Sequence, residues 1–283
     1  MEFNPAQILP SGYPHADTII HSVIHSLHHT LPHQLGSVYI VGSYAEGCAV
    51  EESDLDLTVI LRGQATSAQK QQAARASLPS KSFPVKVDML VCDEAEVLAC
   101  IDPILKFDSR LVWGEDLRDR APLMTLHDWA GERMQKAYRR MMQDLRNGSG
   151  SDQPLTYPDA QDLYYGYLQR SAASGQLTTR PVLRTVGACA AALLSARGGE
   201  YAARRCDCPG LFRQKFGEPF GSLVTDWFEW GKNRWQYRVP SDEAGKVRLK
   251  ELCRLTLGLE QFFLQIYAEE MNITGSIPLQ NFG

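Results

Sequence analysis

Two aspartates, Asp54 and Asp56, lie two residues apart in the alternating run DLDLTVI. Residues two apart in a β-strand point to the same side, so both carboxylates project together while Leu55 and Leu57 project oppositely, into the core. Like charges on one face repel each other unless a cation neutralises them. Magnesium does this through one or two carboxylates together with the phosphates of its substrate. The pair therefore predicts a metal-binding strand face, with a turn or cap role for Asp54 as the alternative.

A third aspartate, Asp88, lies in the run PVKVDMLV, near the centre of an otherwise apolar segment. Charged residues are seldom placed there without partners. If this strand lies beside the Asp54 strand, three carboxylates converge, which is enough for two Mg²⁺ ions about 3.5–4 Å apart. An ion pair with Lys86 or a distant arginine is the alternative explanation for Asp88.

A small-residue turn precedes the acidic run. Gly42 and Ser43 end a short apolar segment, and Gly47 follows in what the pattern predicts to be the first turn of a helix. Glycine lets backbone amides approach a phosphate, and the N-terminus of a helix adds unpaired N–H groups with a favourable dipole. The Ser43 hydroxyl can donate one more hydrogen bond. Together with the three acids, this turn predicts a site for a magnesium-bound triphosphate.

The elements that must position these residues can be read from hydrophobic spacing. Helical spacing predicts an amphipathic helix over residues 17–31, and apolar runs predict strands at 38–41, 55–61 and 85–91. An Ala- and Gln-rich segment at 65–78 is long enough to be a helical crossover between strands of one sheet. The first half is therefore expected to be an α/β domain with a mixed sheet.

Beyond about residue 120 the strand signal fades, and the spacing predicts helices. The expected helical segments are 128–145, 159–173, 181–196, 220–235 and 242–268. A Gly/Ser-rich stretch at 148–154 is expected to be a loop or mobile link. The sequence thus predicts an α+β protein with a domain at 1–120 followed by a helical bundle at 121–283, the boundary falling between 115 and 127.

Composition narrows the function classes. The 283 residues carry a net charge of -4, so there is no basic excess of the kind that favours nucleic acid as a partner. A local basic cleft is the one way in which this composition could still bind nucleic acid. No apolar run approaches the roughly 20 residues that cross a bilayer. The seven cysteines form no framework spacing, and we expect them to be free thiols in a cytoplasmic protein. Cys206 and Cys208 form an isolated C-x-C, for which ordinary loop cysteines are the favoured explanation over zinc binding.

The stretch from Gly42 through Gly47 to Ser53-Asp54-Leu55-Asp56-Leu57 resembles the signature of the DNA polymerase β-like nucleotidyltransferase superfamily, in its minimal and aminoglycoside branches. The segment RLVWGEDL at 110–117 resembles a stretch that often closes this domain. The helical half is similar in layout to the C-terminal bundle of streptomycin/spectinomycin-type adenylyltransferases. One position departs from the pattern: Glu46 stands where minimal nucleotidyltransferases commonly carry a basic residue.

This resemblance implies that Asp54 and Asp56 bind the metals, Gly42 and Ser43 hold the triphosphate, and Asp88 completes the metal site or acts as base. It implies Mg²⁺, expected as two ions, and ATP or another NTP as co-substrate. Further phosphate or acceptor ligands are expected from the helical half, with Lys232 as the candidate triphosphate ligand; Lys215, Arg234 and Arg238 are the other cations considered. Trp230, Trp235 and Tyr237 could stack on a base or sugar, and core packing beside a solvated basic flank is the alternative.

Three functions follow. The first is transfer of a nucleoside monophosphate, AMP from ATP, to a hydroxyl of a small aminoglycoside-like acceptor, with release of pyrophosphate. The second is nucleotidylation of a protein or of an RNA end. The third is a non-catalytic nucleotide-binding regulatory module, against which the retention of all three acids argues. For a cationic acceptor, Asp162, Asp226 and Glu229 are possible ligands that the sequence does not rank, and the oligomeric state is not predicted.

Overall fold

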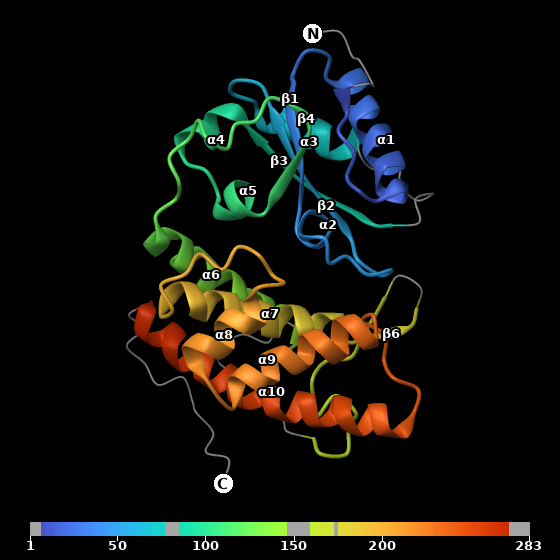
Figure 1. The fold of residues 1–283 in the computed structure, drawn as a ribbon, viewed down its shortest axis with the longest axis vertical. Helices are drawn as coiled ribbons and strands as arrows, with labels where there is room; N and C mark the ends of the chain where they lie inside the picture. Colours follow the sequence, from blue (N-terminus) through green and yellow to red (C-terminus); the bar gives the residue numbers. More distant parts are fainter. Residues whose placement is uncertain (1–6, 77–84, 146–158, 173–174, 272–283) are drawn as a thin grey trace. The chain divides into compact units, whose positions relative to one another are not determined.

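The computed structural model describes residues 7–76, 85–145, 159–172 and 175–271, and these divide into two compact units (Figure 1). Unit 1 comprises residues 1–125 together with the short segment 203–206. Unit 2 comprises residues 126–202 and 207–283. The chain therefore leaves the second unit for four residues and then returns to it.

Unit 1 is built on a four-stranded mixed sheet in the order β3-β2-β1-β4. β1 pairs antiparallel with both β2 and β4, whereas β2 and β3 are parallel. The strands are β1 (Leu35–Val41), β2 (Leu55–Leu61), β3 (Val87–Asp93) and β4 (Ser109–Gly114). The mixed sheet and the α+β fold confirm the sequence prediction.

Helices cover both faces of this sheet. On one face, α1 and α3 pack over the alternate residues of β2 that include Leu55 and Leu57, whose side chains are fully buried as predicted. On the other face, α4 and α5 pack against Tyr39 and Ile60. The helices of unit 1 are α1 (Pro14–Thr30), α2 (Ser43–Glu46), α3 (Ser67–Ala76), α4 (Glu94–Ala99) and α5 (Pro103–Phe107).

Two details of the first half differ from prediction. The third strand begins at Val87, so Asp88 is its second residue and not its centre. β4 was not predicted as a strand; it contains most of the RLVWGEDL segment and forms an edge of the sheet. Gly114 ends it with a φ of +89°, and a side-chain carbon there would lie 2.8 Å from the Cα of Ser37, so only glycine fits this close pairing.

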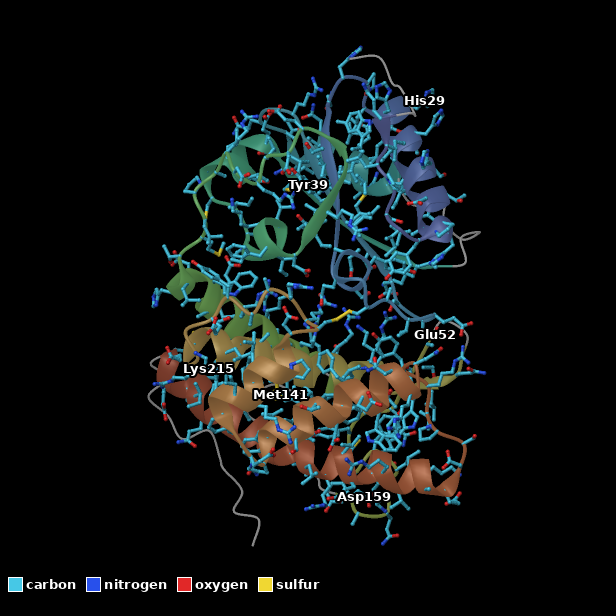
Figure 2. All side chains as sticks on the ribbon, in the orientation of Figure 1. His29, Tyr39, Glu52, Met141, Asp159 and Lys215 are labelled. Atoms are coloured by element: carbon cyan, nitrogen blue, oxygen red, sulfur yellow. A yellow bond between two sulfur atoms is a disulfide. The ribbon has the colours of Figure 1, made fainter. Side chains whose placement is uncertain are left out.

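Unit 2 is mainly helical and has its own core, which includes the fully buried Trp227 and Phe263. Met141, labelled in Figure 2, is also fully buried and is the first residue of η3. None of the described helices combines the length and apolar character needed to span a membrane. The helices are α6 (Leu126–Arg140), η3 (Met141–Leu145), α7 (Arg180–Ala196), α8 (Cys208–Phe216), α9 (Phe220–Asp226), η4 (Trp227–Arg234) and α10 (Glu243–Glu270).

The prediction of a wholly helical second half was wrong in two places. Described residues of 159–173 form turns and the start of a strand instead of a helix, with Tyr165 and Gly166 at positive φ. Two short strands, β5 (Arg170–Ser171) and β6 (Leu177–Thr178), form an antiparallel pair. α8 was not predicted. The expected loop at 148–154 lies outside the described residues.

One buried carboxylate, Asp93, ties the end of β3 to the elements around it. It caps α4 by accepting from the Glu96 N–H at 2.9 Å, and it also accepts from the Ala65 N–H and pairs with Lys70 at 2.9 Å. Burial alone would raise its pKa, but the hydrogen bonds from Glu96, Lys70 and Ala65 outweigh burial and hold the pKa below its usual value. Asp93 therefore stabilises the fold in its ionised form.

Replacing Asp93 by alanine is expected to lower the free energy of unfolding by about 2 kcal/mol or more, because two N–H groups and Lys70 lose their acceptor. Since the folded pKa is depressed, this contribution is present above about pH 4 and lost as the pH falls through the folded pKa. Urea denaturation at pH 7 and at pH 3 measures it. Asp119→Ala, which removes a 96% exposed partner of Lys106, is the control and should change stability by no more than about 0.5 kcal/mol. Equal losses in the two variants would contradict the assignment.

Candidate functional site

A single row across three strands brings two of the three predicted acids, Asp56 and Asp88, together. Val41 of β1 pairs with Asp56 of β2, and Asp56 pairs with Asp88 of β3 in the parallel register. Paired residues of neighbouring strands point to the same face, so the Asp56 and Asp88 carboxylates lie side by side. They occupy the face that α4 and α5 cover farther along the sheet, opposite Leu55 and Leu57.

Asp54 immediately precedes β2, at the end of a tight turn. The Ser53 N–H donates to the Val50 carbonyl at 2.8 Å, and the Val50 N–H donates to the Ser53 hydroxyl at 2.9 Å. The Leu55 N–H then donates to the Lys86 carbonyl, which starts the pairing of β2 with β3. This turn fixes the backbone at Asp54 two residues from Asp56, and the Asp54 side chain is half-buried.

Gly42 lies directly against Asp56. It follows Val41 with φ 69° and ψ −148°, a backbone region that only glycine adopts readily, and it caps the short helix α2. A side-chain carbon at this position would lie 2.9 Å from Asp56 Oδ2. Ser43 is the first residue of α2, and its carbonyl accepts the Cys48 N–H at 2.9 Å. The predicted Gly-Ser turn is thus beside the predicted acids.

Asp88 has a partner in this structure. Its Oδ1 lies 2.7 Å from Lys86 Nζ, which is the alternative explanation raised by the sequence. Both side chains are exposed, Lys86 by 65% and Asp88 by 40%. Ion pairs at the surface contribute little to the stability of a protein. The ion pair therefore does not prevent Asp88 from binding a stronger ligand, because Lys86 can turn towards solvent.

The donor set of Asp54, Asp56 and Asp88 suits Mg²⁺. It consists of carboxylate oxygens alone, which this hard cation prefers, and Asp56 and Asp88 are adjacent in the sheet. Mg²⁺ usually keeps several waters and adds substrate phosphates, so half-exposed carboxylates fit it better than an enclosed cage. The chemistry of these residues therefore matches the predicted metal.

A family model described as a nucleotidyltransferase domain matches residues 29–108. This range contains the Gly42-Ser43 turn and all three acids. The chain carries a nucleotidyltransferase domain of the DNA polymerase β-like superfamily. It spans β1 to β3, and the fourth strand of its sheet follows at once in β4.

One solved structure adds a fold-level likeness that extends beyond the nucleotidyltransferase domain. Spectinomycin adenyltransferase AAD(9) from Enterococcus faecialis, solved with ATP and spectinomycin, is 12% identical with a TM-score of 0.50, covering 84% of this chain and 98% of its own. A protein from Sulfolobus solfataricus assigned as a nucleotidyltransferase is 21% identical, with a TM-score of 0.26, covering 40% of this chain and 96% of its own. A search of curated proteins gives no significant match.

Three of the cations of the helical unit that were considered as phosphate ligands are either buried or engaged in ion pairs. Lys232 is buried in η4, whereas Lys215 pairs with Glu200 and Arg234 pairs with Glu229. The aromatic residues Trp230, Trp235 and Tyr237 pack against the core of unit 2, as the alternative interpretation predicted. Of the acids considered for a cationic acceptor, Asp226 pairs with Arg248, Glu229 with Arg234, and Asp162 accepts from Gly166 and Gln169.

Sequence reasoning missed a second cluster in unit 1. Cys48 forms a disulfide with Cys206, 158 residues later, so the expectation of seven free thiols was wrong for these two; Cys92, Cys100, Cys189, Cys208 and Cys253 are free. Glu46, the residue that departs from the family pattern, accepts the backbone N–H groups of Arg205 and Cys206. Only the unusual acid at position 46 could have signalled this contact from sequence.

Asp108 extends this cluster into the interior. It is 5% exposed, between α5 and β4. Burial and the neighbouring Glu46 carboxylate, to which it is hydrogen-bonded, raise the pKa of Asp108 well above its usual value, while Arg204 and Arg205 partly offset the rise. A raised pKa favours the protonated form of Asp108, whose carboxyl hydroxyl can then donate to the Glu46 carboxylate.

Substituting Gly42 by alanine is expected to weaken binding of a magnesium–ATP analogue by about tenfold or more, because the added carbon displaces Asp56 Oδ2. Gly63→Ala is the matched control: Gly63 also has a positive φ, 64°, but has open space around its α-carbon. Both variants should lose about 1–3 kcal/mol of stability through backbone strain, and only Gly42→Ala should lose affinity. Titration calorimetry and urea denaturation separate the two effects; unchanged affinity in Gly42→Ala would place the triphosphate elsewhere.

Proposed function

We propose that this nucleotidyltransferase transfers AMP from ATP to a hydroxyl group of a small-molecule acceptor, in a magnesium-dependent reaction that releases pyrophosphate. The observation that carries the proposal is the row Val41-Asp56-Asp88 across three strands, with Gly42 directly against Asp56. Such a row is expected where a metal-bound triphosphate and an attacking hydroxyl meet.

In the proposed reaction, the acceptor oxygen forms a bond to the α-phosphorus while the bond from the α-phosphorus to the bridging oxygen of pyrophosphate breaks. Asp54 and Asp56, with Asp88, hold the cations, and bound Mg²⁺ would neutralise triphosphate charge and acidify the attacking hydroxyl. Ser43 donates its hydroxyl to a phosphate oxygen, and Gly42 leaves room for that phosphate beside Asp56. The protein therefore mainly orients groups and offsets charge.

The proton of the acceptor hydroxyl needs a base, and Asp88 is our candidate. Its side chain is 40% exposed and it lies on the edge strand β3, so an acceptor can reach it. A carboxylate next to Asp56 in the sheet can accept the proton as the new bond forms. Lys232 remains our candidate for an additional triphosphate ligand.

For the acceptor class, we propose a hydroxylated small molecule, with aminoglycosides and related antibiotics as the first to test. The net charge of -4 gives no basic excess that would favour RNA. The fold neighbour AAD(9) was solved with ATP and spectinomycin, and its likeness covers 84% of this chain, which supports a shared layout. We also propose a cytoplasmic location, where a reducing environment would open the Cys48–Cys206 disulfide.

Asp54→Asn and Asp56→Asn should each lower pyrophosphate release by about 100-fold or more, because a neutral amide cannot replace a metal-binding carboxylate. The assay incubates the full chain with each labelled NTP, Mg²⁺ and a panel of acceptors, and follows both pyrophosphate and labelled product. Asp119→Asn, a 96% exposed acid of the same unit, should retain wild-type activity.

The acceptor panel separates the three functions predicted from the sequence. A labelled small molecule supports the proposal, whereas label on protein or on an RNA end supports nucleotidylation of a macromolecule. ATP binding without any labelled product would indicate a regulatory module. Activity that survives in Asp54→Asn or Asp56→Asn would overturn the metal assignment.

Asp88→Asn and Lys86→Ala together separate a chemical role of Asp88 from its ion pair. If Asp88 binds metal or accepts the proton, Asp88→Asn should lower kcat by about 100-fold or more, while Lys86→Ala should change it less than about threefold because the pair is exposed. Steady-state kinetics on the identified acceptor measure both. Small and equal effects would show that Asp88 serves only the ion pair.

A further inference from the structure

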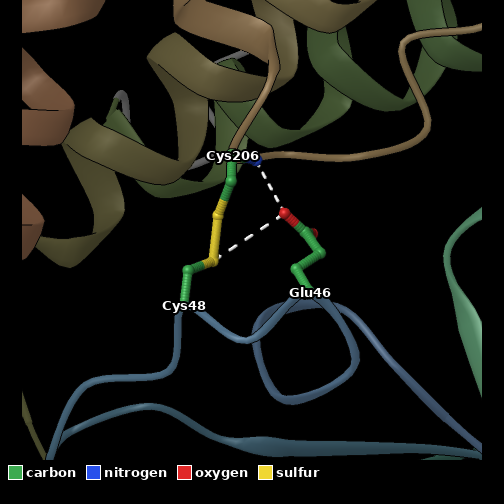
Figure 3. Close-up of side chains that lie close together, drawn as sticks. All are labelled: Glu46, Cys48 and Cys206. Carbon is green, nitrogen blue, oxygen red and sulfur yellow. Dashed lines mark hydrogen bonds between the residues drawn. A yellow bond between two sulfur atoms is a disulfide. The ribbon is translucent and has the colours of Figure 1, made fainter.

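A cluster of two cysteines and a carboxylate lies in unit 1 (Figure 3). The Glu46 carboxylate and the sulfur atoms of Cys48 and Cys206 lie within 4.8 Å of one another, and all three residues are half-buried. Glu46 ends α2, Cys48 follows the left-handed Gly47, and Cys206 belongs to the short segment that unit 1 takes from the second half of the chain.

The carboxylate of this cluster is held in a fixed orientation. Glu46 Oε2 accepts the Cys206 N–H at 2.7 Å, and Oε1 accepts the Arg205 N–H at 3.1 Å. Oε2 also lies 3.8 Å from the Cys48 sulfur. A disulfide sulfur carries no proton to donate, so this last contact is not a hydrogen bond in the oxidised protein. The two backbone N–H groups therefore hold the Glu46 carboxylate near both sulfur atoms, where it can serve as a third ligand.

We propose that, once the disulfide is reduced, Cys48, Cys206 and Glu46 bind a thiophilic divalent cation of the Zn²⁺ type. Reduction by a thiol or phosphine adds two electrons and two protons, which breaks the S–S bond and gives two thiols. Binding of the cation then displaces both thiol protons, so two thiolates and one carboxylate are the ligands. The proposed metal site stands whether or not the chain catalyses nucleotidyl transfer.

The donor set fits zinc. Zinc takes thiolate and carboxylate ligands at about 2.3 Å and about 2.0–2.2 Å, with four ligands in tetrahedral geometry. Two sulfur atoms on such a centre lie about 3.8 Å apart. The Cα atoms of Cys48 and Cys206 are 7.1 Å apart, wider than the usual disulfide range of about 4.4–6.8 Å, which leaves room for that separation. Three protein ligands leave the fourth position to water.

The surroundings supply what a metal ligand normally needs. Ligating carboxylates are usually hydrogen-bonded by a second layer of groups, and Glu46 accepts the N–H groups of Arg205 and Cys206. The two sites in this unit would also select different cations: the three aspartates offer oxygen alone, which suits Mg²⁺, while two thiolates favour softer metals. Neither site competes for the other's cation.

Cobalt is the probe, because Co²⁺ takes zinc sites and its thiolate bonds give a charge-transfer band in the near ultraviolet. The full chain, reduced by a phosphine and freed of metal by a chelator, is titrated with Co²⁺ under anaerobic conditions. We expect a band that saturates at one Co²⁺ per chain and disappears when one equivalent of Zn²⁺ is added. The oxidised chain should show no such band.

The variants locate the ligands. Cys48→Ser and Cys206→Ser should each lose the wild-type band, and Glu46→Gln should keep thiolate binding but weaken Co²⁺ affinity by about tenfold or more. Cys208→Ser is the matched control, since Cys208 is two residues from Cys206 but buried in the core of unit 2. Circular dichroism checks folding, and zinc protection of Cys48 and Cys206 from alkylation, read by peptide mass spectrometry, gives a second measurement on the wild type.

Reduced wild type that shows neither the cobalt band nor zinc protection would overturn the proposal and leave the cysteines as a disulfide cross-link only. A band of full strength in Cys48→Ser would place the metal on other thiols and would also overturn it. Because the readout is a thiolate band and alkylation, loss of nucleotidyl transfer does not affect the result. Asp54→Asn should retain the band, which separates this site from the triphosphate site.

Discussion

Repulsion between the carboxylates of Asp56 and Asp88 is the constraint on which the candidate site depends. The parallel register of β2 and β3 sets these two acids opposite each other on one face. Like charges in this position destabilise a sheet unless something offsets them. Lys86 offsets part of the charge, but its ion pair is exposed and therefore weak. The fold tolerates the arrangement because the two carboxylates are half-exposed and stay hydrated. A bound cation would remove the repulsion that remains between them.

The surrounding elements serve this register. Parallel strands cannot be joined by a tight turn, so β2 and β3 require a crossover, and α3 lies within it. The antiparallel partner β1 ends at Val41, opposite Asp56, so that the chain must turn away at Gly42 without a side chain. At the far end of β3, Asp93 anchors α4 and the segment that leads into α3. Each of these connections thus helps to hold β2 and β3 in the register that pairs Asp56 with Asp88.

Much of this could be read from the sequence because the signals are local. Alternation in DLDLTVI gave the faces of Asp56 and Leu57, and the length of the crossover made adjacency of β2 and β3 reasonable. β4 escaped prediction because its run is short and its exposed Arg110 breaks the apolar pattern; pairing with β1 makes it a strand. The segment 159–173 looked helical by spacing, but the buried rings of Tyr164 and Tyr167 belong to turns, around a Tyr165 with positive φ.

The cysteine cluster could not be predicted in the same way, since Cys48 and Cys206 are separated by 158 residues and share no motif. Proximity in sequence even misleads here: Cys206 and Cys208 are two residues apart, yet one belongs to unit 1 and the other to the core of unit 2. What joins the cluster to the candidate site is the backbone of α2. The Glu46 N–H donates to the Gly42 carbonyl, and the Cys48 N–H donates to the Ser43 carbonyl. A four-residue helix held by these bonds has little freedom to move at one end alone, so the position of Glu46 and Cys48 constrains that of Gly42 and Ser43.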